Sequence, residues 1–279
     1  MLTLQKNCTP WPSSKRQPTT PFHPDLHLIP TTDVDPVRAH KNLQLQGSQL
    51  YLEPNIPGIS WTMRELGSMT HCVTPEAFQA RVDMHRFLER VKKSMRIITY
   101  DPSAAPLEVY SDTNHARDKI YKTSTWCGVV YIYGCPLIVQ VSTLNPEIST
   151  AHVEYVGGSM AADLGLGIQN FLTEIDPDDQ SIKEPLKIHM DASSAIHAAV
   201  CPAMLPKFKH IAIHAQKLRT SCQYGLVELA KVSSENNVAD MGTKPATSLA
   251  EYVKNQQPFM QTHEELLAKG YTIYKHPEK

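Results

Sequence analysis

The chain has 279 residues, with 27 lysines and arginines against 28 aspartates and glutamates and a net charge of −1. This length allows one large domain or two small ones. The near-neutral balance excludes a global basic field, so any attraction for a polyanion must come from local patches.

Cysteine spacing and hydropathy exclude secreted and membrane proteins. The six cysteines show no C-x-x-C spacing, which favours ordinary thiols over a disulfide framework or a zinc site. No run of 18 apolar residues is present, and the N-terminus lacks the apolar core of a signal peptide. We therefore expect an intracellular protein, cytoplasmic or nuclear, with no membrane contact.

Two regions precede the predicted catalytic domain. Residues 1–38 are rich in proline, serine and threonine and carry few periodic apolar positions, so we expect a disordered or extended leader. Residues 39–100 have helical periodicity. Thr74 followed by Pro75 and Glu76 predicts a helix start, with threonine as the N-cap and proline as the first helical residue.

Residues 101–250 predict an α/β domain, followed by a C-terminal tail over 251–279. Short apolar runs that end in turn residues indicate strands, and apolar residues at helical spacing indicate helices. The order is three strands and then helix, strand, helix and strand, which predicts a mixed five-stranded sheet with helices on both faces. The predicted strands are Leu107–Asp112, Trp126–Tyr133, Leu137–Ser142, Leu186–Met190 and Leu226–Val232, and the helices are one from Thr150 and Lys207–Gln223.

Four acidic residues in this region are the candidate catalytic and metal-ligating residues. Asp112 and Asp191 each end a predicted strand, Glu154 lies in the first turn of a predicted helix, and Asp240 lies near the start of a short one. Carboxylates that converge from such positions suit a pair of Mg²⁺ ions, which prefer oxygen ligands. Two such ions can promote phosphodiester cleavage.

Each of these residues also has a structural interpretation. A single aspartate at a strand end is usually a cap or turn residue, and acids are favoured in the first turn of any helix. Asp240 lies in the polar segment NNVAD and is as readily a surface acid. The glycines at 157, 158 and 165 have two interpretations as well, close packing of the helix or decay of the element.

The order and flanks of the acids resemble the ribonuclease H domain of copia-type retrotransposon polyproteins. The family segments read like YSDADWA, SSTEAEY, CDNQSAI, KHIDIRYHFIR and LADILTKP. An upstream segment, Gly47–Met69, is similar to the part that joins the reverse transcriptase to the nuclease. The matching segments of this chain are YSDTNHA (Tyr110–Ala116), STAHVEY (Ser149–Tyr155), MDASSAI (Met190–Ile196), KHIAIHAQKLR (Lys209–Arg219) and VADMGTKP (Val238–Pro245).

The resemblance implies a ribonuclease H-like fold and cleavage of the RNA strand of an RNA–DNA hybrid with two Mg²⁺ or Mn²⁺ ions. Asp112 and Asp191 would hold or bridge both metals, Glu154 would bind one of them, and Asp240 would complete the second site. A further partner would be the polymerase part of the same polyprotein. The resemblance also suggests nucleic-acid contacts for Lys209, His210 and Arg219.

Two positions beside the acids depart from the family pattern. Ala192 stands where the family has asparagine, and His152 where it has a second acid. These departures affect substrate grip and metal tuning rather than the ligands themselves. The rival interpretation is a decayed or repurposed fragment that binds nucleic acid or protein without cleaving it.

Overall fold

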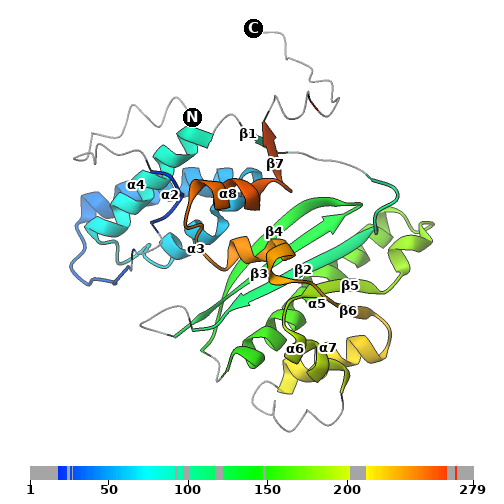
Figure 1. Cartoon of the computed structure of the whole chain (residues 1–279). Helices are drawn as coiled ribbons and strands as arrows, with labels where there is room; N and C mark the ends of the chain where they lie inside the picture. The colour runs from blue at the N-terminus through cyan, green and yellow to red at the C-terminus, as the bar shows by residue number, and fades with distance from the viewer. Residues whose placement is uncertain are drawn as a thin grey trace.

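A mixed five-stranded sheet forms the centre of the structure, and a group of helices lies beside it (Figure 1). This arrangement is seen in a computed structural model of the chain. The model describes residues 18–23, 26, 28–91, 94–96, 101–116, 122–146, 149–201, 212–262 and 268.

The sheet has the strand order β4-β3-β2-β5-β6. β2, β3 and β4 are antiparallel neighbours, while β5 is parallel to both β2 and β6. Positive φ angles at Tyr133 (45°) and Gly134 (76°) allow the tight hairpin between β3 and β4. The predicted mixed sheet is confirmed. The strands are β2 (Leu107–Asn114), β3 (Ser124–Ile132), β4 (Cys135–Leu144), β5 (Leu186–Met190) and β6 (Val227–Lys231).

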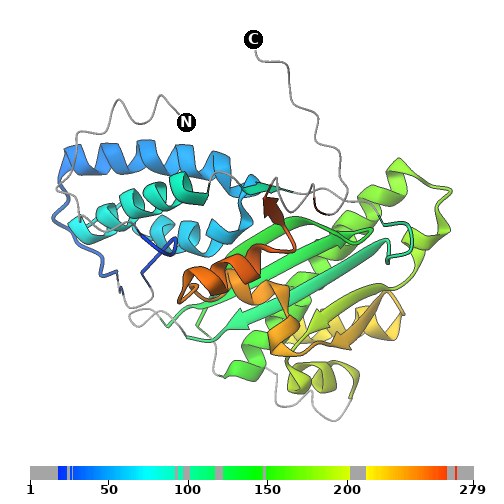
Figure 2. The same ribbon diagram turned by 45° about the horizontal axis from the view of Figure 1, so that its top comes forward.

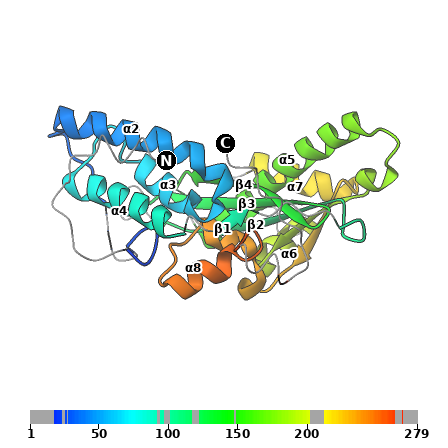
Figure 3. The same cartoon turned by 90° about the horizontal axis from the view of Figure 1, so that it is seen from above.

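Helical elements cover both faces of the sheet, as Figure 3 shows from above. On one face the long helix α5 (Thr150–Ile175) contacts β2, β3 and β5, and α6 (Ser193–Val200) and α7 (Ala212–Gln223) pack against it. On the other face the short 3₁₀ helix η6 (Val238–Gly242) contacts β2, β3 and β4. Among the described helices, none has the length and apolarity needed to cross a membrane.

Glycines let α5 lie close to the sheet. A Cβ atom at Gly157 would lie 2.5 Å from Cγ2 of Thr113, and one at Gly165 would lie 2.4 Å from Cδ2 of Leu186. Real Cβ atoms do not approach other heavy atoms so closely, so side chains at these two positions would push the helix off β2 and β5. Close packing, and not decay, therefore explains these glycines.

The helices beside the sheet enclose a buried arginine. Arg81 has no exposed surface, and its guanidinium donates hydrogen bonds to Asn42 (2.7 Å), Gln49 (3.0 Å) and the carbonyl oxygen of Leu66 (3.0 Å). These bonds satisfy the buried charge with neutral acceptors and tie three helices together. They are α2 (Pro36–Leu52), α3 (Ser60–Gly67) and α4 (Pro75–Val91).

The first part of the chain differs from the expectation of an extended, unpacked leader over residues 1–38. Phe22 is only 4% exposed and packs edge-on against Trp61, with ring centroids 5.2 Å apart. Helix α2 already begins at Pro36, where Asp35 accepts a hydrogen bond from the Val37 N–H. A single aromatic residue among prolines has no periodic pattern, so its burial could not be anticipated from the sequence.

The region expected as a tail over 251–279 also starts inside the folded structure. Helix α8 (Leu249–Gln256) packs against α4 through an edge-on contact of Tyr252 with Phe87. Figure 2 shows α8 in orange beside the blue and cyan helices. Strand β7 (Met260–Thr262) then pairs with β1 (Ser94–Arg96). Segments that precede and follow the five-stranded sheet in the sequence therefore build the helical region.

The close packing of α5 predicts opposite effects of one substitution at two of its glycines. Gly165→Ala should destabilise the protein by about 1–3 kcal/mol, because the added methyl group overlaps Leu186. Gly167 has open space around it, so Gly167→Ala should stabilise the protein by up to about 1 kcal/mol through helix propensity. Urea unfolding measures both, and equal effects would contradict the packing argument.

The burial of Phe22 predicts that the leader contributes to stability. Phe22→Ala should lower the free energy of unfolding by about 3 kcal/mol, because it removes a buried ring from the Trp61 cluster. Ile29 in the same segment is 66% exposed, so Ile29→Ala is a matched control with little expected effect. A loss at Ile29 as large as that at Phe22 would show that the effect is not due to burial.

Candidate active site

Asp112 and Asp191 lie side by side at one end of two parallel strands. In the β2–β5 pairing Ser111 is opposite Met190, and each aspartate is the next residue along its chain. Asp112 is still within β2, whereas Asp191 follows the last residue of β5. Asp112 is 3% exposed and Asp191 is partly exposed. The two strands are adjacent and parallel, as expected, and the two aspartates follow paired residues at the same end of the pair.

Glu154 reaches the same place from helix α5. It is the fifth residue of this helix, so the expectation of a first-turn position was wrong, and the first turn of α5 contains no acid. Glu154 is 8% exposed, and its burial, followed by the nearby charge of Asp112, raises its pKa. The glycines that follow Glu154 bring this part of the helix down onto β2.

Asp240 is brought to the centre by the attachment of η6 to β2. The side chain of Asn237 accepts a hydrogen bond from the Ala239 N–H at 3.3 Å and caps η6. The same side chain donates a hydrogen bond to the carbonyl oxygen of Ser111 at 3.0 Å. Because Ser111 directly precedes Asp112, one asparagine ties the Asp240 turn to the end of β2 that carries Asp112.

Two of the four carboxyl groups hold their protons more tightly than usual. Burial raises the pKa of Asp112 to about 7, opposed by a hydrogen bond from Thr243 and reinforced by the negative charges of Asp240 and Asp191. Burial and then the charge of Asp112 raise the pKa of Glu154 to about 8. The four acids are therefore close enough for their charges to interact, and the site favours added positive charge.

Three donors from the segment that follows β6 contact the carboxylates. Thr243 Oγ1 donates a hydrogen bond to Asp112 Oδ2, and Ser234 Oγ donates one to Asp191 Oδ2 at 2.7 Å. Lys244 forms an ion pair with Asp240. The sequence predicts no role for Ser234, Thr243 or Lys244, although the last two lie within the segment VADMGTKP. Spacing along the chain does not show which carboxylate a hydrogen-bond donor contacts in the folded protein.

The donor set fits hard divalent cations chemically, since it consists of four carboxylates, two of them buried. Over the residues that the structure describes, no three side chains already form a metal-ligating group. Thr243, Ser234 and Lys244 each contact one of the carboxylates instead.

Of the three residues suggested for nucleic-acid contact, the structure describes Arg219. It is 4% exposed within α7, so its side chain is not available to a phosphate in this conformation. Lys209 and His210 lie outside the described residues.

Comparisons with known proteins agree with the resemblance. No family model matches the chain. It is 27% identical over 235 residues to the Retrovirus-related Pol polyprotein from transposon RE1 of Arabidopsis thaliana, covering 83% of this chain and 16% of that protein. It is 25% identical over 205 residues to the corresponding polyprotein from transposon RE2, covering 73% and 14%. The expected relation to retrotransposon polyproteins is confirmed, and the chain spans about a sixth of their length.

Two similar solved structures are ribonuclease H proteins. One is the N-terminal RNase H domain of Rv2228c from Mycobacterium tuberculosis, with 12% identity and a TM-score of 0.34, covering 55% of this chain and 98% of that chain. The other is LC11-RNase H1, isolated from compost, with 15% identity and a TM-score of 0.32, covering 54% and 99%.

The raised pKa values predict how stability depends on pH without metal. The folded-state pKa values of Asp112, about 7, and Glu154, about 8, exceed those of unfolded carboxyl groups. The folded state therefore binds more protons than the unfolded state across this window, and stability falls as pH rises from about 4 to 8. Asp112→Asn should make this fall shallower in thermal unfolding with EDTA. If the melting temperature depended on pH equally in the wild type and in Asp112→Asn, the raised pKa of Asp112 would not be the cause.

Proposed function

We propose that this chain is the ribonuclease H part of a retrotransposon polyprotein and cleaves the RNA strand of an RNA–DNA hybrid with divalent cations. The proposal is supported by the placement of Asp112 in β2, Asp191 directly after β5, Glu154 in α5 and Asp240 in η6. The charges of Asp191 and Asp240 act on Asp112, and the charge of Asp112 acts on Glu154. Two of these acids are buried with raised pKa values. Its relatives, the Pol polyproteins of two transposons, support the same assignment.

The four acids have different surroundings and therefore different roles. Asp112 is the most buried and lies between the other acids, so it is suited to bridging two cations. Asp191 and Asp240 are partly exposed and would complete the two sites on the solvent side. Glu154 would hold one ion from the α5 side. Two bound Mg²⁺ ions would supply an activated water and stabilise the leaving oxygen.

The protein's own groups would keep these carboxylates in place. Ser234 fixes one oxygen of Asp191 through its hydrogen bond of 2.7 Å, which leaves the other oxygen free to turn toward a ligand. Thr243 acts on Asp112 in the same way. Such outer contacts orient metal-binding carboxylates and typically change affinity or activity by about 10- to 100-fold when removed.

The substrate class follows from the expected chemistry and the relatives. A hybrid presents the 2′-hydroxyl groups of only one strand, and these groups distinguish RNA from DNA at a site. The chain has no excess of positive charge, so binding depends on divalent ions at the centre more than on a basic surface. The polymerase part of the same polyprotein is the proposed partner that would deliver the hybrid.

Hybrid cleavage by single-residue variants tests the proposal. The wild-type chain should cut the RNA strand of a labelled hybrid in Mg²⁺ or Mn²⁺, spare duplex DNA and stop in EDTA. Asp112→Asn and Asp191→Asn should slow cleavage by at least about 100-fold, because each removes a ligand charge with little change in volume. Asp240→Asn should have a smaller effect, because Asp240 is one-third exposed.

Asp163→Asn is the matched control, because Asp163 is an exposed residue of α5 that pairs with Lys217 outside the centre. This variant should cleave at the wild-type rate. Hybrid binding without cleavage by the wild-type chain would favour the repurposed, non-catalytic fragment. Cleavage that persists in EDTA would contradict the metal mechanism.

A further inference from the structure

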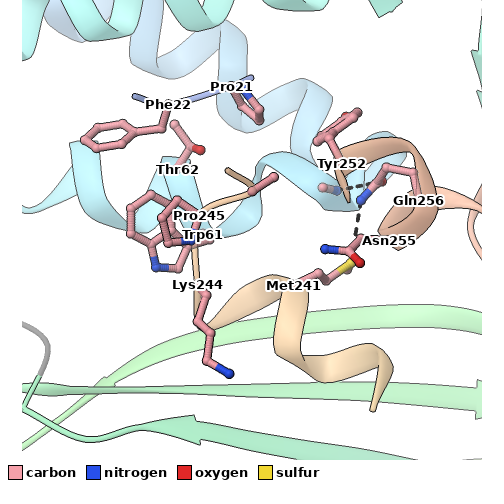
Figure 4. Close-up of a pocket in the computed structure, with 12 residues that line it drawn as sticks. Pro21, Phe22, Trp61, Thr62, Met241, Lys244, Pro245, Tyr252, Asn255 and Gln256 are labelled. Atoms are coloured by element: carbon pink, nitrogen blue, oxygen red, sulfur yellow. Dashed lines mark hydrogen bonds between the residues drawn. The ribbon is translucent and has the colours of Figure 1, made fainter. Parts of the chain in front are cut away.

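Lys244 places a positive charge inside the carboxylate cluster. Its ammonium group forms an ion pair with Asp240, one helical turn earlier in the chain. Figure 4 shows the side chain extending from the segment after η6 toward the strands of the sheet. Its charge also acts on Asp112, Glu154 and Asp191. One lysine thus interacts with all four acids of the proposed centre.

The backbone at this lysine is held firmly in place. Thr243, the preceding residue, has no exposed surface. Its hydroxyl bonds to Asp112, and its carbonyl oxygen accepts a hydrogen bond from Asn114 Nδ2 at 3.1 Å. These contacts fix the backbone from which the Lys244 side chain starts, beside the end of β2.

Lys244 lines a small crevice between the segment that follows η6 and helices α3 and α8. Lys244 and Pro245 line this crevice together with Trp61 and Tyr252 (Figure 4), and its volume is about 10 Å³, room for about one water molecule. The ammonium end remains partly exposed, with 51% of the side chain accessible. The side chain can therefore turn away into solvent without disturbing the core.

We propose that Lys244 is the resident counter-ion of the carboxylate cluster and that a divalent cation displaces it on binding, so that Lys244 sets the metal affinity of the centre. This inference rests on the proposed function. Lys244 pairs with Oδ1 of Asp240, so a metal ion bound by this oxygen would compete with the lysine. An ammonium near the centre also repels Mg²⁺ directly. When no metal is bound, Lys244 compensates part of the negative charge of the carboxylate cluster.

Three substitutions and one titration test this inference. Melting temperature is measured against Mg²⁺ concentration for the wild-type chain and for Lys244→Gln, Lys244→Arg and Lys217→Gln. Lys244→Gln should lower the midpoint concentration of Mg²⁺ by roughly three- to tenfold, because a competing charge is gone. In EDTA it should melt below the wild type, because the acids then lack their counter-ion.

The other two variants separate charge from other effects. Lys244→Arg keeps the charge and should keep a midpoint near that of the wild type. Lys217→Gln removes a lysine of matching exposure, 49%, from the Asp163 ion pair outside the centre, and should change neither the midpoint nor the melting temperature in EDTA appreciably.

The outcomes distinguish this inference from the proposed function. If the wild-type chain responds to Mg²⁺ but Lys244→Gln has an unchanged or higher midpoint, the counter-ion role is overturned and the metal centre stands. A higher midpoint would mean that Lys244 supports the ion instead of competing with it. If the wild-type melting temperature does not respond to Mg²⁺ at all, the metal centre fails and the inference fails with it.

Discussion

The structure depends on holding four carboxyl groups in one place. Asp112 and Asp191 meet because two parallel strands end together, and Glu154 and Asp240 are added from opposite faces of the sheet. Mutual repulsion and the loss of water both oppose this arrangement. The surrounding fold supplies the compensation through Thr243, Ser234 and Lys244. This compensation is partial. If the chain neutralised the acids completely, a cation would gain little electrostatic free energy by binding them.

The second constraint is the closeness of α5 to the sheet. Glu154 can reach Asp112 only because the helix that carries it approaches β2 closely, and glycines at 157 and 165 make room for that approach. Each glycine costs helix propensity. The helix tolerates this cost because its other residues bury a large apolar face against β2, β3 and β5. The geometry of the site is therefore set in part by the packing of α5 along the sheet.

The helical region contains segments that precede and follow the five-stranded sheet in the sequence, and it is joined to that sheet by hydrogen bonds. The Gly58 N–H donates a hydrogen bond to Gln256 Oε1 at 2.9 Å, and Arg64 donates one to Thr143 on β4 at 3.1 Å. Phe259 and Met260 join the apolar cluster on the face of the sheet that carries η6. Changes in the helical region can reach Asp240 and Lys244 through these contacts, because η6 lies between this region and β2.

The sequence by itself determined the strands, the long helix and the four acids, because periodic apolar runs and their flanks are local properties. It could not determine the burial of Phe22 or of Arg219, the exact depth of Glu154 in α5, or the roles of Thr243 and Lys244. Those depend on which segments meet in space. A hydrogen bond from Thr243 to Asp112 joins residues 131 positions apart, and only the tertiary structure decides such a pair.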